Sequence, residues 1–338
     1  MSQLQPILMS PVLAEKPWGG RRLARYGKDL PDGLQIGESW EVADLPAEAV
    51  STVDDPRSRV ASGPFTGMSL RDLIARFGED FLGCVSPTEE GDFPLLVKLL
   101  DAREHLSVQV HPDRKYVKKH PQTRLKTESW YVVAADPDAH LYLGLRDGVA
   151  VGDVAARLGT AGIVGLLNTV PAVPGDFHHL PAGLVHALGA GVLVAEVQTP
   201  SDTTFRVYDW GRTDREIHVA AALECIEYGP VTADAREGSA ERQGGDGERV
   251  LVTCPHFGIA EWRGGSEVRR RLDIGAPEVW MVIGGSIEIR SASDGYDPVR
   301  AGTGQTVLMP ASLGPTAVAG DAGLVMLRVT LPKRGTTA

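Results

Sequence analysis

The sequence predicts a mainly β protein with a few helices, built as a sandwich or a barrel. Short runs rich in β-branched and aromatic residues alternate with Gly, Pro and Asp along the 338 residues. Such spacing favours a sandwich or barrel over a doubly wound sheet, and no Gly-x-Gly-x-x-Gly or Walker loop contradicts it. The expected strands are PLLVKLL (94–100), LSVQVH (106–111), SWYVVAA (129–135), GVLVAEVQT (191–199), TTFRVYDW (203–210), EVWMVIGG (278–285), SIEIRS (286–291) and QTVLMPA (305–311).

Three segments have a helical pattern instead. The segment 69–83 begins with Ser69 and has Asp72 three residues later, which is typical of a capping box before an amphipathic helix. The segments 151–168 and 218–226 have a similar period, and the first of them is interrupted by glycines. These helices are expected to pack beside the sheets.

Composition excludes several classes of function. The chain is 43% hydrophobic and 23% charged, which suits a globular protein with room for two domains. The formal charge is −10 and no basic cluster is present, which argues against a nucleic-acid partner. The three cysteines are far apart, so neither a disulfide framework nor a cysteine zinc site is indicated. Residues 1–20 lack a basic leader and no long apolar stretch follows, so we expect a cytoplasmic protein without a membrane partner.

Two segments look like diverged copies of one hairpin. The first, 175–186, has the pattern Gly-x5-Pro-x-Gly-x2-His, and the second, 304–315, repeats Gly-x5-Pro but has Ser312 and Pro315 in place of the later Gly and His. Only the first copy keeps a metal-capable histidine. We therefore expect a catalytic unit at 1–229, a linker or mobile loop at 230–249 that is poor in large apolar residues, and a degenerate unit at 250–338.

Gln109 and His111 lie two residues apart in an alternating apolar run that ends at Pro112. Successive side chains of a strand point to opposite faces, so these two donors share one face. A lone Gln-x-His is also compatible with a hydrogen-bonded glutamine and a surface histidine. The rest of the sequence decides between these interpretations.

The pattern at 175–186 resembles the second motif of the cupin superfamily, in which the histidine points into a small barrel as a metal ligand. It departs from the usual motif at Ala190, where Asn often stands. The full set of motifs is similar to that of the class I mannose-6-phosphate isomerases, also called phosphomannose isomerases, in their compact bacterial form. The motifs are KPWGG (16–20), GESWEVAD (37–44), PLLVKLLDAREHLSVQVHPD (94–113), KTESWYVV (126–133), LPAGLVHALGAG (180–191) and EVQTPSDTTFRVYDWGR (196–212).

This resemblance implies a cupin (RmlC-like jelly roll) barrel followed by a degenerate cupin-like unit. It implies one zinc ion per chain, a sugar-phosphate substrate, and reversible isomerisation of mannose 6-phosphate and fructose 6-phosphate through an enediol. Ligand chemistry alone also allows another divalent ion, because nitrogen and oxygen donors do not select zinc by themselves. The ligands implied are Gln109, His111, Glu128 and His186.

The resemblance also implies the residues that act on the substrate. Lys126 lies two residues from Glu128 and Glu196 stands in an apolar strand, so both are candidates for proton transfer. The structural alternatives are a solvated lysine at 126 and an ion pair between Glu196 and Arg206. Arg206 is expected to stabilise the enediolate or orient the sugar, and Lys98 and Ser107 match positions associated with the phosphate. Lys98 as a strand-edge residue and Ser107 as a core serine are the alternatives.

Rival functions share the same fold. Another cupin sugar-phosphate isomerase or a metal-dependent cupin oxygenase is the first alternative, although an oxygenase is expected to use iron with histidine and carboxylate ligands only. A non-catalytic sugar-binding cupin is the second, and the retention of all four donors in the first copy argues against it. The adjacent His178 and His179 face opposite ways on a strand, so at most one lines the site. No oligomeric state is indicated.

Overall fold

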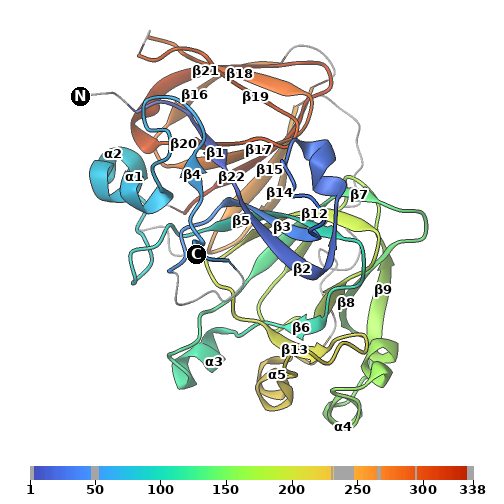
Figure 1. Cartoon of the computed structure of the whole chain (residues 1–338). Helices are drawn as coiled ribbons and strands as arrows, with labels where there is room; N and C mark the ends of the chain where they lie inside the picture. The colour runs from blue at the N-terminus through green and yellow to red at the C-terminus, as the bar shows by residue number, and fades with distance from the viewer. Residues whose placement is uncertain are drawn as a thin grey trace.

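The computed structural model describes residues 4–46, 53–229, 231, 247–264, 268–293 and 295–332. The fold is mainly β, as the sequence predicts, and each of two units pairs a large sheet with a smaller one (Figure 1). In the first unit the sheet orders are β10-β7-β12-β5-β2-β3 and β13-β6-β11-β8-β9. The bounds are β2 Val12–Gly20, β3 Ile36–Val42, β5 Leu96–Ala102, β6 Val108–Val110, β7 Glu128–Ala135, β8 His140–Leu145, β9 Leu167–Pro171, β10 Phe177–Leu180, β11 His186–Leu188, β12 Val192–Gln198 and β13 Phe205–Tyr208.

The second unit is formed largely by the C-terminal part of the chain. Its sheets have the orders β14-β15-β22-β17-β20-β1-β4 and β16-β21-β18-β19. The bounds are β1 Ile7–Ser10, β4 Arg59–Val60, β14 Gly247–Thr253, β15 Gly258–Arg263, β16 Val268–Ile274, β17 Glu278–Gly284, β18 Ser286–Ser291, β19 Val299–Gly302, β20 Thr306–Met309, β21 Gly314–Gly320 and β22 Val325–Thr330.

The two units repeat one strand order. The first contains the layers β5-β12-β7-β10 and β6-β11-β8-β9, and the second contains β15-β22-β17-β20 and β16-β21-β18-β19 in the same order along the chain. Two such four-stranded layers form a jelly roll. Gly175 and Gly304 precede equivalent strands and have positive φ angles of 92° and 80°. The topology therefore agrees with the hairpin repeat that the sequence indicates.

The two units are not two consecutive segments of the chain joined by one linker. The seven-stranded sheet takes β1 and β4 from the N-terminal part of the chain. Most of the predicted linker, 230–249, lies outside the described residues, and β14 already begins at Gly247. The division into 1–229, 230–249 and 250–338 stays a prediction.

The helices cap the sheets at their ends. Ser69 accepts a hydrogen bond from the amide of Asp72 and the Asp72 carboxylate accepts one in return, so the predicted capping box is confirmed. The segment 151–168 forms only one short α-helix, which ends at Ala155, and a 3₁₀ helix before β9; Gly159, with a φ of 78°, lies in the turn between them. No helix of the described residues is long and apolar enough to cross a membrane. The bounds are η1 Arg22–Tyr26, α1 Leu70–Phe77, α2 Glu79–Leu82, α3 Arg114–Lys119, α4 Val151–Ala155, η3 Ala161–Leu166, α5 Val219–Cys225 and η4 Ala311–Leu313.

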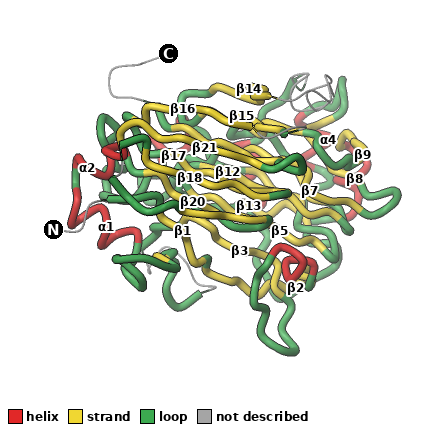
Figure 2. The backbone as a smooth tube through the Cα atoms, turned by 90° about the horizontal axis from the view of Figure 1, so that it is seen from above, coloured by secondary structure: helices red, strands yellow, loops and turns green. Residues whose placement is uncertain are grey.

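The large sheets of the two units share a hydrophobic core. Tyr131 and Leu193 of the first unit belong to the same buried cluster as Val279 and Leu327 of the second. The Tyr131 hydroxyl adds a polar link, because it donates to Glu261 across the units at 2.6 Å. In Figure 1 the strands of the second unit lie above those of the first, and Figure 2, seen from above, shows α1 and α2 at one side and α4 at the other. The outer face of each large sheet is thus buried against the other unit.

The inner face of the second barrel carries an ion pair. Glu278 lies opposite Met309 in the second unit, as Glu128 lies opposite Leu180 in the first. Arg328 lies opposite Trp280, and Glu196 lies opposite Trp130 at the equivalent position. Arg328 donates from Nε to Glu278 Oε2 at 2.7 Å and also binds the second oxygen with Nη2. In the second barrel a guanidinium group therefore balances the buried carboxylate.

Replacing Arg328 by Met is expected to destabilise the fold. The change leaves the buried Glu278 carboxylate without its cation, a loss of about 3 kcal/mol in the free energy of unfolding. Urea unfolding measures it. The double variant Arg328→Met/Glu278→Gln removes the buried charge too and is expected to regain part of the loss. Equal stability of Arg328→Met and the parent protein would contradict this role of the ion pair.

Candidate metal centre and active site

Three strands bring four predicted metal ligands together. Gln109 lies on β6 opposite His186 on β11, His111 follows β6, and Glu128 begins β7. Glu128 Oε2 lies 3.3 Å from His111 Nε2, and Glu128 Oε1 lies 3.1 Å from His186 Nε2. The two histidines and the glutamate are buried, and their potential ligand atoms all lie within 4.8 Å of one another. The alternative of a surface histidine at position 111 is therefore wrong.

The protonation of the two imidazoles shows why this cluster fits a cation. His111 Nδ1 lies 3.1 Å from the Thr203 carbonyl oxygen, and His186 Nδ1 lies 2.8 Å from the Leu184 carbonyl oxygen. A carbonyl only accepts hydrogen bonds, so both Nδ1 atoms carry the proton and both Nε2 atoms present lone pairs. These lone pairs face the Glu128 carboxylate, whose two oxygens have no hydrogen-bond partner in the described part of the chain. A bound divalent ion would satisfy all of these atoms.

Gln109 completes the donor set from the same face of β6. Its Nε2 lies 3.3 Å from His186 Nε2, and its Oε1 accepts a hydrogen bond from Ser107 Oγ at 3.3 Å. Rotation of the amide by 180° exchanges the two atoms. Gln109 can therefore present an oxygen to a cation while its nitrogen donates to the Ser107 hydroxyl.

The electrostatics of the cluster favour a neutral His111 and an ionised Glu128. Burial, followed by the positive charge of Lys126, lowers the pKa of His111 to about 3. Burial alone would raise the pKa of Glu128, but Lys126 and the two histidines outweigh it and hold that pKa well below its usual value. Metal binding requires these protonation states, so no proton has to leave His111 or Glu128 near neutral pH.

Lys126 and Glu196 both line a cavity of about 500 Å³ beside the cluster. Lys126 is buried and its Nζ lies 3.2 Å from Glu128 Oε2, so the alternative of a solvated lysine is wrong. Glu196 accepts a hydrogen bond from Trp130 Nε1 at 2.9 Å. Burial and the negative charge of Glu128 raise the pKa of Glu196, and Lys98 only partly opposes them.

Lys98 is the ionic partner of Glu196, rather than Arg206. Its Nζ lies 3.5 Å from Glu196 Oε1 and 3.6 Å from Glu38 Oε2. Because β5 lies between β12 and β3, Lys98 is central in the sheet and buried, which excludes a strand-edge role. Its charge is shared by two carboxylates that a low dielectric would otherwise destabilise.

Glu38 is a buried residue of this cavity that the sequence analysis did not assign. Trp40 Nε1 donates to Glu38 Oε2 at 2.6 Å. Burial opposes ionisation of Glu38, but Lys16, Lys98 and this hydrogen bond lower its pKa to about 2. A signal was present, because Glu38-Ser-Trp40 has the same Glu-x-Trp pattern as Glu128-Ser-Trp130.

Of the remaining residues predicted near the site, two line the cavity and the two adjacent histidines do not. The cavity wall also contains Ser107 and Arg206, and Ser107 is buried as the core-serine alternative expects. His178 lies opposite Trp130 on the inner face of β10, whereas His179 bonds Ser129 Oγ and packs against Phe257. Neither histidine belongs to the buried group of His111, Glu128 and His186 or to the lining of the cavity among the described residues.

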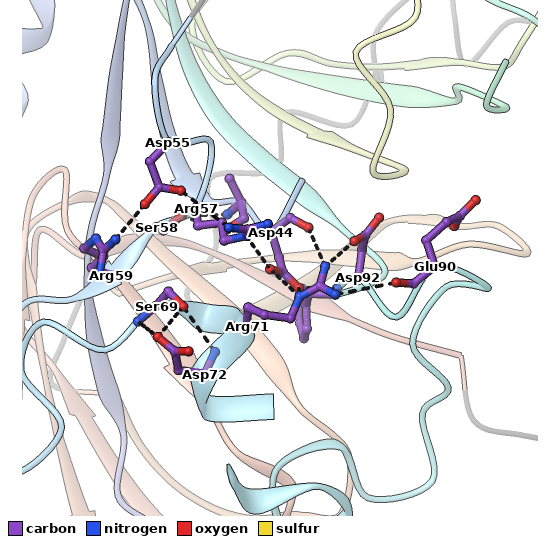
Figure 3. A network of polar contacts seen from close by, with 12 residues as sticks. Asp44, Asp55, Arg57, Ser58, Arg59, Ser69, Arg71, Asp72, Glu90 and Asp92 are labelled. Carbon is purple, nitrogen blue, oxygen red and sulfur yellow. Dashed lines mark hydrogen bonds and ion pairs between the residues drawn. The ribbon is translucent and has the colours of Figure 1, made fainter. Parts of the chain in front are cut away.

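The residues before Lys126 are anchored by a polar network. Arg71 binds Asp44 at 3.1 Å and also Asp92, as Figure 3 shows. Arg124 Nη1 then donates to Asp92 Oδ2 at 2.6 Å and to the Pro200 carbonyl oxygen at 3.4 Å. The segment before β7 that carries Lys126 and the loop whose Thr203 carbonyl orients His111 are thereby held together.

We expect Glu128→Gln to abolish stoichiometric metal binding. Without the carboxylate charge, the two imidazoles and one amide form a weak site. After chelation, metal returned at about 100 times its Kd is expected to stabilise the parent protein by about 2.7 kcal/mol and the variant by none. Elemental analysis and thermal unfolding measure both. Glu278→Gln, the equivalent change in the second barrel, is the matched control and should keep the metal; loss of metal in both variants would contradict the assignment.

Known proteins are similar to this chain in sequence and in fold. The family described as "Phosphomannose isomerase type I, catalytic domain" matches residues 7–140. The mannose-6-phosphate isomerase of Streptococcus mutans serotype c is 34% identical over 77% of this chain and 79% of its own length. The mannose-6-phosphate isomerase ManA of Bacillus subtilis is also 34% identical, over 76% of this chain and 79% of its own length.

Solved structures show the same fold over nearly the whole chain. The crystal structure of the mannose 6-phosphate isomerase from Bacillus subtilis has a TM-score of 0.83 at 29% identity and covers 97% of this chain and 100% of its own. The apo mannose 6-phosphate isomerase from Salmonella typhimurium has a TM-score of 0.74 at 17% identity, which is a likeness of fold alone. The identity and coverage of the relatives show that this chain belongs to the type I phosphomannose isomerase family.

Proposed function

We propose that the chain interconverts mannose 6-phosphate and fructose 6-phosphate in the cavity beside Glu128, as a metal-dependent aldose–ketose isomerase. The observation that carries this is the meeting of two imidazole lone pairs and one carboxylate at a cavity also lined by Lys126 and Glu196. Family membership and the names of the relatives support the same reaction.

The proposed ligands are Gln109, His111, Glu128 and His186, and the proposed ion is one zinc per chain. Two neutral imidazoles, a carboxylate and an amide oxygen suit zinc at a catalytic site. When bound, zinc supplies a Lewis acid for the developing oxyanion of the sugar. The hydrogen bonds from His111 and His186 to backbone carbonyls fix both rings in the tautomer that binds metal.

Proton transfer is assigned to Lys126 and Glu196. Isomerisation through an enediol moves one proton from C2 to C1 of the aldose and a second proton from O2 to O1. One group must therefore remove the C2 proton and return it to C1, and a second group must carry the proton between the two oxygens. Glu196 has a raised pKa, which suits both removal and return, and Trp130 and Lys98 hold its carboxylate in place. Lys126 lies beside Glu128, with Nζ 3.2 Å from Oε2, and lines the same cavity.

Substrate binding is assigned to Arg206, Ser107 and Lys98. Arg206 lies opposite Gln109 in the pairing of β13 with β6, next to the proposed metal. A fixed guanidinium group at this position orients the sugar and stabilises negative charge on the enediolate. Ser107 and Lys98 supply a hydroxyl donor and a positive charge for the phosphate. A cytoplasmic location, where sugar phosphates occur, completes the proposal.

Isomerase activity is tested directly on the purified protein. Mannose 6-phosphate should yield fructose 6-phosphate in a coupled assay, and the activity should vanish after chelation and return with zinc. Oxygen uptake serves as the control that excludes a cupin oxygenase. A fully metal-loaded protein without fructose 6-phosphate formation would contradict the proposed substrate.

Lys126→Met and Glu196→Gln test the assignment of proton transfer. Each variant is expected to lower kcat by about 10²- to 10⁴-fold, the usual contribution of a general acid or base. Bound zinc should stay at the parent level, because neither residue is a proposed ligand. Loss of metal in either variant would contradict the assignment of that residue to proton transfer and would show that it supports metal binding instead.

A further inference from the structure

The lysines of the cavity wall already have carboxylate partners. Lys16 lies 3.4 Å from Glu38, Lys98 is shared by Glu38 and Glu196, and Lys126 lies 3.2 Å from Glu128. These cations balance buried carboxylates, so each brings only part of its charge to a ligand. A phosphate dianion therefore requires a further donor at the wall.

Arg215 has the geometry of such a donor. It lines the cavity and is held by Asp209, to which Nε donates at 2.8 Å and Nη2 at 2.6 Å. Asp209 is buried, so it fixes the plane of the guanidinium group. Nη1 of Arg215 has no hydrogen bond to any residue that the structure describes, and its two protons are available to an anion.

The neighbouring Arg206 also has a hydrogen-bond donor without a partner among the described residues. Its Nη1 donates to the Glu216 carbonyl oxygen at 2.9 Å, but its Nε is buried and has no partner within the described ranges. Burial, and then the positive charge of Arg215, lower the pKa of Arg206. Two guanidinium groups are thus close enough to repel each other, and an anion between them would offset that repulsion.

The order of residues along the cavity gives the direction of the substrate. Arg206 is opposite Gln109, which is a proposed ligand, and Arg215 follows in the loop after β13. A sugar with C1 and C2 at the metal extends past Arg206. Its phosphate, at the far carbon, then meets the loop that carries Arg215.

We infer that Arg215, positioned by Asp209, binds the phosphate group of the substrate in addition to Ser107 and Lys98. This inference rests on the proposed function, since it concerns the same cavity and the same sugar phosphate. Asp209 acts as a positioning residue. The bidentate contact leaves one edge of the guanidinium group facing the ligand.

Steady-state kinetics of Arg215→Gln test the inference. Loss of one charge-assisted contact is expected to raise KM for mannose 6-phosphate by about 10- to 100-fold, with kcat and bound metal near the parent values. The inhibition constant of inorganic phosphate, used as a probe of the anion site, should rise by a similar factor. Arg215→Lys should recover part of the loss, and Asp209→Asn should raise KM less than Arg215→Gln.

Arg103→Gln is the matched control, because it removes the same charge from an exposed arginine that pairs with Glu104. It should leave KM unchanged. An unchanged KM in Arg215→Gln, or a lower kcat at constant KM, would overturn the inference while the proposed function stands. Absence of any turnover in the metal-loaded parent protein would instead contradict the proposed function itself.

Discussion

The site depends on one buried carboxylate, Glu128, that faces two imidazole lone pairs. Without a cation this is an unfavourable arrangement, because a negative group and two neutral acceptors meet in a space from which water is excluded. The backbone carbonyls of Thr203 and Leu184 hold both rings so that they cannot turn their protonated nitrogens inward. The fold thus maintains a cluster that only a positive charge satisfies, and Lys126 supplies part of it.

The second barrel shows another solution to the same physical problem. It keeps the Glu-x-Trp pattern at Glu278 and Trp280, and Trp280 Nε1 donates to the Glu278 carboxylate at 2.8 Å. Arg328 then stands where the first barrel has Glu196. The first unit keeps two buried carboxylates, Glu128 and Glu196, whereas the second balances Glu278 with the guanidinium group of Arg328, which occupies the position equivalent to Glu196.

The two units support each other although their inner faces differ. Their large sheets bury their outer faces in one cluster, so the strands that carry Lys98, Glu128 and Glu196 are backed by packed side chains of the other unit. Hydrogen bonds add to this support, because Arg124 donates to Asp92 and the Thr203 carbonyl oxygen holds the ring of His111. Rigid support on both sides keeps several buried charges at fixed distances, which is what acid–base chemistry requires.

The sequence by itself determined the fold class, because short alternating runs with frequent turn residues specify a mainly β fold. Alternation also predicted that Gln109 and His111 share one space, and the structure places Gln109 opposite His186 and His111 beside Glu128. Their role as metal ligands comes from the family resemblance and stays a prediction. Which strands adjoin was decided only by the tertiary structure, since hydrogen-bonded pairing joins residues far apart in the chain. That is why Glu196 was assigned Arg206 as a possible partner while its partner is Lys98 on the neighbouring strand. For the same reason Asp209 and Arg215 carry no local signal of the role proposed for them, because it arises from contacts that only the folded chain creates. Glu38 does carry a signal, the Glu-x-Trp pattern that it shares with Glu128, but its contacts with Lys16 and Lys98 also come from the folded chain.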